Sequence, residues 1–276
     1  MKSNRKALFA GVLLLTACKI NKSDYPETEI TFEDQYVASA ALQVDRFINE
    51  FEFIARNIKL AYPNQPGILD GTTITTGQTE EGKTKYDIVF SNLQGSDNRI
   101  RRGKITVVFE DGLEDGVVVP AKHIHVRSDD ENNLYTFDGL KFKGSLVFSN
   151  ITAAKNSSTV SIEHLNAQSF LIKSNTEQIR FSSSRKSKWI AGSATSNTND
   201  DVFEISDQDY SLDIVGSTTE FAEITTVSPS TLGYTCPQFL FIPKKGKLKI
   251  EHLGGNTRFL FLGSGNCSDG AIIQEN

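Results

Sequence analysis

From residue 68 onward the sequence is a succession of short runs in which Val, Ile, Thr and Phe alternate with polar residues. This period-2 alternation is typical of half-buried β-strands and constrains the fold more than any other feature. The runs recur about every ten residues, and the connections are too short for crossover helices, so neighbouring strands should be antiparallel. We therefore predict a mostly β domain over 68–276, either an antiparallel β-sandwich or a strongly curved sheet. The expected strands are 86–93, 103–110, 117–127, 144–150, 159–164, 169–173, 178–182, 202–205, 210–215, 221–227, 239–242, 247–253, 258–262 and 271–274.

Three Asp-Gly pairs interrupt the first half of this region. Asp and Gly tolerate the positive φ angles of two-residue hairpin turns, so each pair predicts a tight turn between strands. The pairs are Asp111-Gly112, Asp115-Gly116 and Asp138-Gly139.

One segment, 34–60, departs from the β pattern, because its apolar residues recur every three or four positions and polar residues fill the gaps. That spacing predicts an amphipathic helix, capped by Thr31 or Asp34 and stopped before Pro63, within a helical region of 34–62. The polar positions are largely acidic, which disfavours a membrane-surface helix. We expect the apolar stripe to pack on the β-sheet. Its members are Val37, Ala40, Ala41, Val44, Phe47, Ile48, Phe51, Ile54, Ala55 and Ile58.

The N-terminus has the layout of a secretory signal peptide, with Lys2, Arg5 and Lys6 before an apolar run at 7–15 that is too short to cross a bilayer. The run ends in Leu15-Thr16-Ala17-Cys18, which resembles the bacterial lipobox. The resemblance implies that 1–17 is removed, that Cys18 is acylated, and that 18–33 tethers the domain to a membrane. Lys19 after the cysteine favours the outer membrane, with the domain facing the periplasm or the cell surface. An ordinary secretory signal with a chance cysteine is the alternative.

Of the three cysteines, Cys236 and Cys267 remain once Cys18 is assigned to lipid. An even pair in an oxidising compartment favours a disulfide, which would close a loop of about thirty residues and stabilise the fold by roughly 3–4 kcal/mol. Two cysteines with no nearby third and fourth ligand are a poor zinc site.

Charge and motifs exclude some functions and leave others open. The net charge of −5 and the lack of a basic block after the signal disfavour nucleic acid as a partner. No cofactor fingerprint is present, and no GxSxG motif marks a serine nucleophile. Paired carboxylates for glycoside hydrolysis remain open, since their pairing is invisible in sequence.

Two constellations are weak candidates for binding. His123 and His125 share one face of an expected strand beside an acidic loop, where a metal ion is conceivable, although a solvated face is the favoured interpretation. Arg185, Lys188 and Trp189 form the one basic and aromatic stretch, which suggests contact with a glycan. A lone tryptophan on a strand is more often packing.

Several short stretches along most of the chain carry a resemblance. They are Tyr86-Asp87-Ile88-Val89-Phe90, Arg101-Arg102-Gly103-Lys104-Ile105, Phe137-Asp138-Gly139-Leu140-Lys141-Phe142-Lys143-Gly144, Trp189-Ile190-Ala191-Gly192, Asp200-Asp201-Val202-Phe203, Cys236-Pro237 and Gly265-Asn266-Cys267-Ser268-Asp269. In this order they are similar to stretches of an uncharacterised family of lipoproteins common in Bacteroidota. That family usually has Asp-Phe-Gly and a cysteine where this chain has Asp87-Ile88-Val89 and no cysteine, so one of the family's cross-links is missing here. The resemblance supports architecture and location and implies no activity.

Two classes of function stay open. One is a non-catalytic envelope module that binds a glycan or protein or has a structural role, held to the membrane by the lipid on Cys18. The other is a lipid-anchored hydrolase acting on carbohydrate. The missing nucleophile, metal and cofactor motifs favour the first class.

Overall fold

A computed structural model of the chain describes residues 30–60, 69, 71–95, 98–151, 161–192, 200–216, 219–234, 241–253 and 256–275. The signal peptide, Cys18 and Cys236 lie outside these ranges, so the structure does not bear on the lipid anchor or on the predicted disulfide. In the described part, no helix is both long and apolar enough to cross a membrane.

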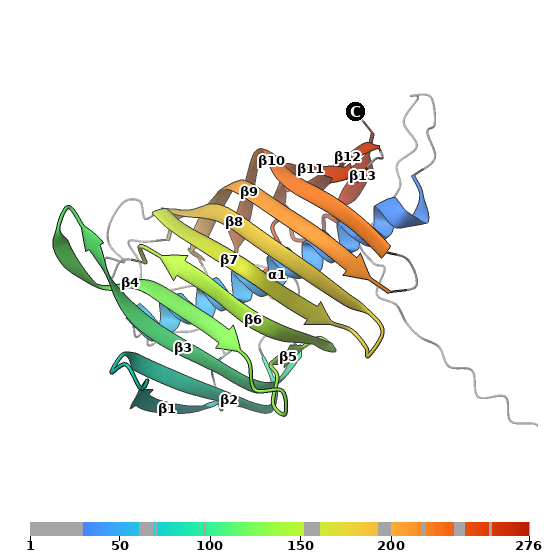
Figure 1. Cartoon of the computed structure of the whole chain (residues 1–276). Coiled ribbons are helices and arrows are strands. Elements are labelled where there is room, and N and C mark those ends of the chain that lie inside the picture. Colours follow the sequence, from blue (N-terminus) through green and yellow to red (C-terminus); the bar gives the residue numbers. More distant parts are fainter. Residues whose placement is uncertain are drawn as a thin grey trace, which may run out of the picture.

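The described residues form one helix and one continuous antiparallel sheet (Figure 1). Strands follow one another in chain order, except that the short β5 pairs with β3 and β6 beside the main path. A single curved sheet therefore replaces the sandwich alternative. The elements are α1 (Phe32–Leu60), β1 (Thr73–Gln78), β2 (Thr84–Gln94), β3 (Ile100–Glu114), β4 (Val117–Ser128), β5 (Thr136–Phe137), β6 (Leu140–Ser149), β7 (Ser161–Ile172), β8 (Gln178–Ala191), β9 (Val202–Val215), β10 (Thr219–Gly233), β11 (Lys245–His252), β12 (Thr257–Ser264) and β13 (Ile272–Gln274).

Helix α1 begins with a reciprocal cap and ends where the sequence predicts. The Asp34 backbone N–H donates to Thr31 Oγ1 at 3.2 Å, and the Thr31 N–H donates to Asp34 Oδ2 at 2.9 Å. Two N–H groups that the helix cannot satisfy internally are thus paired at its start.

The sheet encloses α1 more completely than the amphipathic pattern predicts. Every residue of 47–57 is buried, including the charged Glu50, Glu52 and Arg56. Figure 1 shows α1 running across the strands along one face of the sheet, which curls round it. The apolar stripe packs as expected, and Phe51 meets Phe142 edge-on with ring centroids 4.7 Å apart.

Charged residues on the polar side of α1 pair with arginines that point inward from the sheet. Arg185 of β8 donates to Asp45 Oδ1 at 2.9 Å and to Glu52 Oε2 at 2.8 Å. Burial would raise the pKa of Glu52, but the guanidinium groups of Arg185 and Arg56 outweigh this and hold the pKa below its ordinary value. Burial raises the pKa of Asp45, which shares Arg185 with Glu52. The helix therefore needs polar as well as apolar partners from the sheet.

Most strands are longer than predicted, and two pairs of predicted strands are continuous. Segments 159–164 and 169–173 fall along β7, and 202–205 and 210–215 both belong to β9. The turn predictions hold at Asp115-Gly116 and Asp138-Gly139, where both residues have positive φ. Asp111-Gly112 is not a turn, because it lies within β3 at a register shift opposite β4. Of the expected strand at 239–242, residues 239 and 240 lie outside the described ranges, and Phe241 and Ile242 form a turn and bend instead of a strand.

Candidate functional site

A β-bulge in β2 begins a concave polar site in the described part of the chain. Phe90 pairs with Gly103 of β3 and Leu93 pairs with Arg101, so Ser91 and Asn92 together face Arg102. Asn92 has a φ of 54°, a left-handed conformation that asparagine tolerates better than most residues. A bulge bends its strand and redirects side chains, which here opens the sheet beside Arg102.

The loop before β5 forms a second wall, because a glycine lets it cross β3 closely. Gly103 has a φ of 92°, and a Cβ atom there would lie 2.2 Å from the carbonyl oxygen of Leu134. The Lys104 N–H donates to the Asn133 carbonyl at 2.9 Å and fixes the crossing. Any larger residue at 103 would push this wall away.

The β5–β6 hairpin supplies the third wall and sets the site's side chains in a row. Thr136 of β5 pairs with Arg102 on one side and with Lys141 of β6 on the other. Directly opposed residues in antiparallel strands point to the same face, so these three side chains lie together. The next row, Arg101, Phe137 and Leu140, points the other way into the core, where the Arg101 guanidinium lies 4.4 Å from the Phe137 ring centroid.

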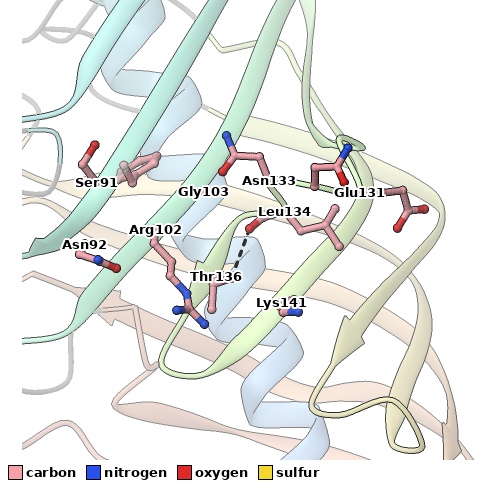
Figure 2. Close-up of a pocket in the computed structure, with 11 residues that line it drawn as sticks. Ser91, Asn92, Arg102, Gly103, Glu131, Asn133, Leu134, Thr136 and Lys141 are labelled. Carbon is pink, nitrogen blue, oxygen red and sulfur yellow. Dashed lines mark hydrogen bonds between the residues drawn. The ribbon is translucent and has the colours of Figure 1, made fainter.

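These three walls enclose a pocket of about 420 Å³. Figure 2 shows Arg102 and Lys141 on either side of Thr136, with Ser91, Asn92 and Asn133 farther round. Arg102 and Lys141 are exposed, and neither has an ion pair or side-chain hydrogen bond with any residue that the structure describes. The one carboxylate among the lining residues, Glu131, is already paired with Lys143. The pocket therefore carries two cationic groups without counter-charges.

The lining residues lack two features of hydrolytic active sites. Glycosidases need two carboxyl groups about 5–10 Å apart, and the lining residues supply one. Ser91 has no histidine among the lining residues to act as a base. Outside the pocket, the carboxylates of Asp45 and Glu52 lie close together, but they are 1 % and 5 % exposed, and both bind the same guanidinium. This pair is therefore structural.

The predicted glycan-contact set of Arg185, Lys188 and Trp189 is wrong as a single surface. Arg185 and Trp189 are 2 % and 1 % exposed, and Trp189 stacks on Phe203 with ring centroids 5.5 Å apart. Lys188 is exposed on the opposite face of β8. The prediction ended a strand at residue 182, whereas β8 continues to Ala191. Successive side chains along a strand alternate in direction, so this extension separates Lys188 from the other two.

The two histidines share a strand as predicted but bind separate partners. His123 Nδ1 lies 2.7 Å from Ser149 Oγ, and His125 Nε2 lies 2.8 Å from Glu110 Oε2. A hydrogen bond from Lys83 and another from His125 help to hold the pKa of Glu110 below its ordinary value. In the described ranges no three His, Cys, Asp or Glu side chains gather as a metal site would require.

Sequence reasoning therefore missed the site's main residues. It singled out Arg101-Arg102-Gly103 and the Asp138-Gly139 stretch as motifs but gave Arg102, Thr136 and Lys141 no role. The Asp-Gly turn signal at 138–139 correctly places Lys141 opposite Thr136, but nothing local places β5 against β3. The chain matches no family model, no curated protein and no solved structure.

Proposed function

We propose that the chain is a lipid-anchored cell-envelope protein whose β domain is a non-catalytic binding module. The observation that carries the binding role is the row of Arg102, Thr136 and Lys141, in which two cationic side chains face a pocket without counter-charges. The ligand is a small polar molecule or the end of a glycan, since 420 Å³ holds a ligand of about one or two sugar rings.

Binding is tested on the soluble domain, residues 19–276, by NMR titration with neutral and acidic mono- and disaccharides. Binding should shift the amide signals of Asn92, Gly103 and Thr136 while those of the distant strands β9 and β10 stay in place. Release of reducing sugar from a bound disaccharide would show that the hydrolase alternative is correct. If no probe shifts these signals, the binding proposal fails.

The lipid anchor rests on the lipobox-like Leu15-Thr16-Ala17-Cys18 and on the segment between Cys18 and the start of α1, which is long enough to act as a tether. Acyl chains contribute about 0.8 kcal/mol per buried CH₂, so two or three chains hold a protein at a membrane. Metabolic labelling with a fatty acid should label the full chain and not its Cys18→Ala variant. A Cys18→Ala form that still labels and sediments with membranes contradicts the anchor.

A second candidate function, contact with a protein, is favoured by the ribbon formed by residues 111–121 of β3 and β4. This ribbon extends beyond the last pairs with β2 and β6, and Figure 1 shows it projecting from the sheet. Its tip exposes Leu113, Val117 and Val118 by 68 %, 65 % and 59 %. Exposed apolar groups on an isolated two-stranded ribbon gain stability when they are covered.

The occupant that fits this tip is a protein with an apolar groove and a basic rim. Asp111, Glu114 and Asp115 give the ribbon a negative charge that disfavours anionic lipid. The tip also lies far from the start of α1: Lys59 in the last turn of α1 bonds to the Ala121 carbonyl at 2.7 Å, at the opposite end of a helix about 43 Å long.

A photo-crosslinking residue at position 118 of the full chain tests this contact in cells. It should give a protein adduct that Glu114→Lys weakens, because the charge of the tip is then partly reversed. The same crosslinking residue at position 253 is the control. Leu253 is 80 % exposed, and its neighbour His252 contacts Asp34 at the start of α1, the end of the helix opposite the tip. Equal protein adducts at 118 and 253, or a phospholipid adduct at 118, would overturn the candidate.

A further inference from the structure

We propose that the pocket beside Arg102 selects a sugar that carries a negatively charged oxygen group, a carboxylate or a phosphate. This inference rests on the proposed binding function and narrows it to one ligand class. Its basis is the charge of the pocket together with the uncommitted polar groups around it.

The charge balance of the lining residues is the first step. Glu131 is neutralised by Lys143, which leaves the charges of Arg102 and Lys141 uncompensated within the described structure. Some other cations on the sheet are paired: Lys186 binds Asp207 at 3.0 Å, and Lys249 binds Glu251 at 2.7 Å. Lys188 and Lys245 are exposed and also have no ion pair within the described residues, but neither lines the pocket. What distinguishes Arg102 and Lys141 is that two such cations face one pocket of a chain whose net charge is −5.

The geometry of the row is the second step. Arg102 and Lys141 are separated by one strand, so their backbones lie about 10 Å apart, and their side chains lie on the same face of the sheet on either side of Thr136. A guanidinium presents two parallel N–H donors that match a carboxylate or phosphate, and an ammonium adds a point charge. One anionic group held between them would contact both.

The amides of the pocket supply the third step. The side chains of Asn92 and Asn133 line the pocket and have no hydrogen bond in the described structure. The hydroxyl of Ser91 also lines the pocket and has none. Amide groups both donate and accept, which suits the hydroxyls of a sugar ring. Cations at one wall and amides at the others therefore fit a ligand with an anionic group on a hydroxylated ring.

Calorimetric titration of residues 19–276 with glucuronate, glucose 6-phosphate, glucose and inorganic phosphate tests the proposal. Glucuronate or glucose 6-phosphate should bind at least tenfold more tightly than glucose and inorganic phosphate, and added salt should weaken the binding. Arg102→Gln and Lys141→Gln should each lower the affinity for the anionic sugar about tenfold. Both side chains are exposed, so these variants should fold normally, which thermal unfolding checks.

Lys188→Gln is the matched control, because it removes an exposed cation from β8 and should leave the affinity unchanged. A preference for glucuronate over glucose 6-phosphate, or the reverse, identifies the anionic group. Glucose binding as tightly as the anionic sugars, with no loss in Arg102→Gln, overturns the inference and leaves the binding function standing. Inorganic phosphate binding as tightly as glucose 6-phosphate overturns the sugar part. If no probe binds in either calorimetry or NMR, the proposed binding function fails as well.

Discussion

Glu50 shows how a single buried charge positions the helix inside the sheet. Its carboxylate accepts a hydrogen bond from Arg101 Nε at 2.8 Å and another from the Tyr135 hydroxyl, and the side chains of Glu50 and Arg101 are fully buried. Arg101 belongs to the row behind the pocket, so this ion pair connects α1 to the strand that carries Arg102. A buried pair is costly to break, because the remaining charge has no solvent to stabilise it.

Glu50→Gln should therefore lower the free energy of unfolding by about 3–5 kcal/mol, measured by urea denaturation. Glu114→Gln is the control, because Glu114 is 63 % exposed and lies 3.7 Å from Lys122, and the change there should be less than about 1 kcal/mol. Equal, small effects of the two substitutions would mean that the buried pair does not hold the helix.

Lys244 makes the free energy of unfolding vary with pH in the alkaline range. Burial and the nearby Arg46 lower the pKa of Lys244 from 10.5 to about 8. Between pH 8 and 10.5 the unfolded chain therefore binds more protons at this group than the folded protein does, so the free energy of unfolding rises with pH. Below pH 8 the group is charged in both states and its contribution is constant.

The Lys244→Met variant should lack this rise, so its stability relative to wild type should be greatest near pH 7 and decline by pH 10. Urea denaturation of both proteins at pH 7, 8, 9 and 10 measures the difference, with Lys188→Met as the exposed control. A constant difference between Lys244→Met and wild type across this range would contradict the lowered pKa.

At the scale of elements, the helix and the sheet depend on each other. Phe51 is fully buried against the sheet, so Phe51→Asp should lower the free energy of unfolding by several kcal/mol. Phe32 is 68 % exposed at the start of the same helix, and Phe32→Asp should change the free energy of unfolding by about 0.5 kcal/mol or less. Thermal unfolding followed by circular dichroism separates the two. If Phe51→Asp melts like wild type, the helix does not pack in the sheet as described.

The crossing of the 129–135 loop over β3 depends on Gly103. Gly103→Ala should displace the loop and abolish ligand binding at the pocket, because the new Cβ would meet the Leu134 carbonyl. Gly82→Ala is the matched control: Gly82 also has a positive φ, but nothing lies within 4 Å of a Cβ there. Gly82→Ala should cost only about 1–2 kcal/mol of backbone strain and leave ligand binding at the pocket, measured by NMR titration, unchanged. Normal binding by Gly103→Ala would show that the loop is not a wall of the site.

At the scale of the whole molecule, the sheet ends in the short strands β12 and β13, and the predicted Cys236–Cys267 disulfide would connect the segment after β10 to the end of β12. The bond stays a prediction, because Cys236 lies outside the described residues. Alkylation of the native protein without reductant should modify neither thiol. Cys236→Ser with Cys267→Ser should lower the free energy of unfolding by roughly 3–4 kcal/mol. Modification of both thiols in native protein would contradict the bond.

The sequence by itself determined the mostly β class, the antiparallel pairing of neighbouring strands and the span of α1. These features are local: alternation with a period of two marks strands, a period of 3.6 marks the helix, and Thr31 and Asp34 mark its start. The alternation failed in β8 beyond residue 182, because the inward side chains there include the polar Ser183, Arg185 and Ser187. They face inward because α1 presents Asp45 and Glu52 to them, and a partner so distant in the sequence leaves no local signal.

Only the tertiary structure decided which polar residues are buried and which meet at a pocket. Arg102 and Lys141 come together because β5 pairs with both of their strands, and the register of that pairing depends on contacts across the fold. A shift of this register by one residue would turn the side chains of Arg102 and Lys141 into the core and that of Arg101 into solvent. Composition and local spacing are the same in both cases, so the pocket is a property of strand pairing, whereas the strands themselves are a property of the sequence pattern.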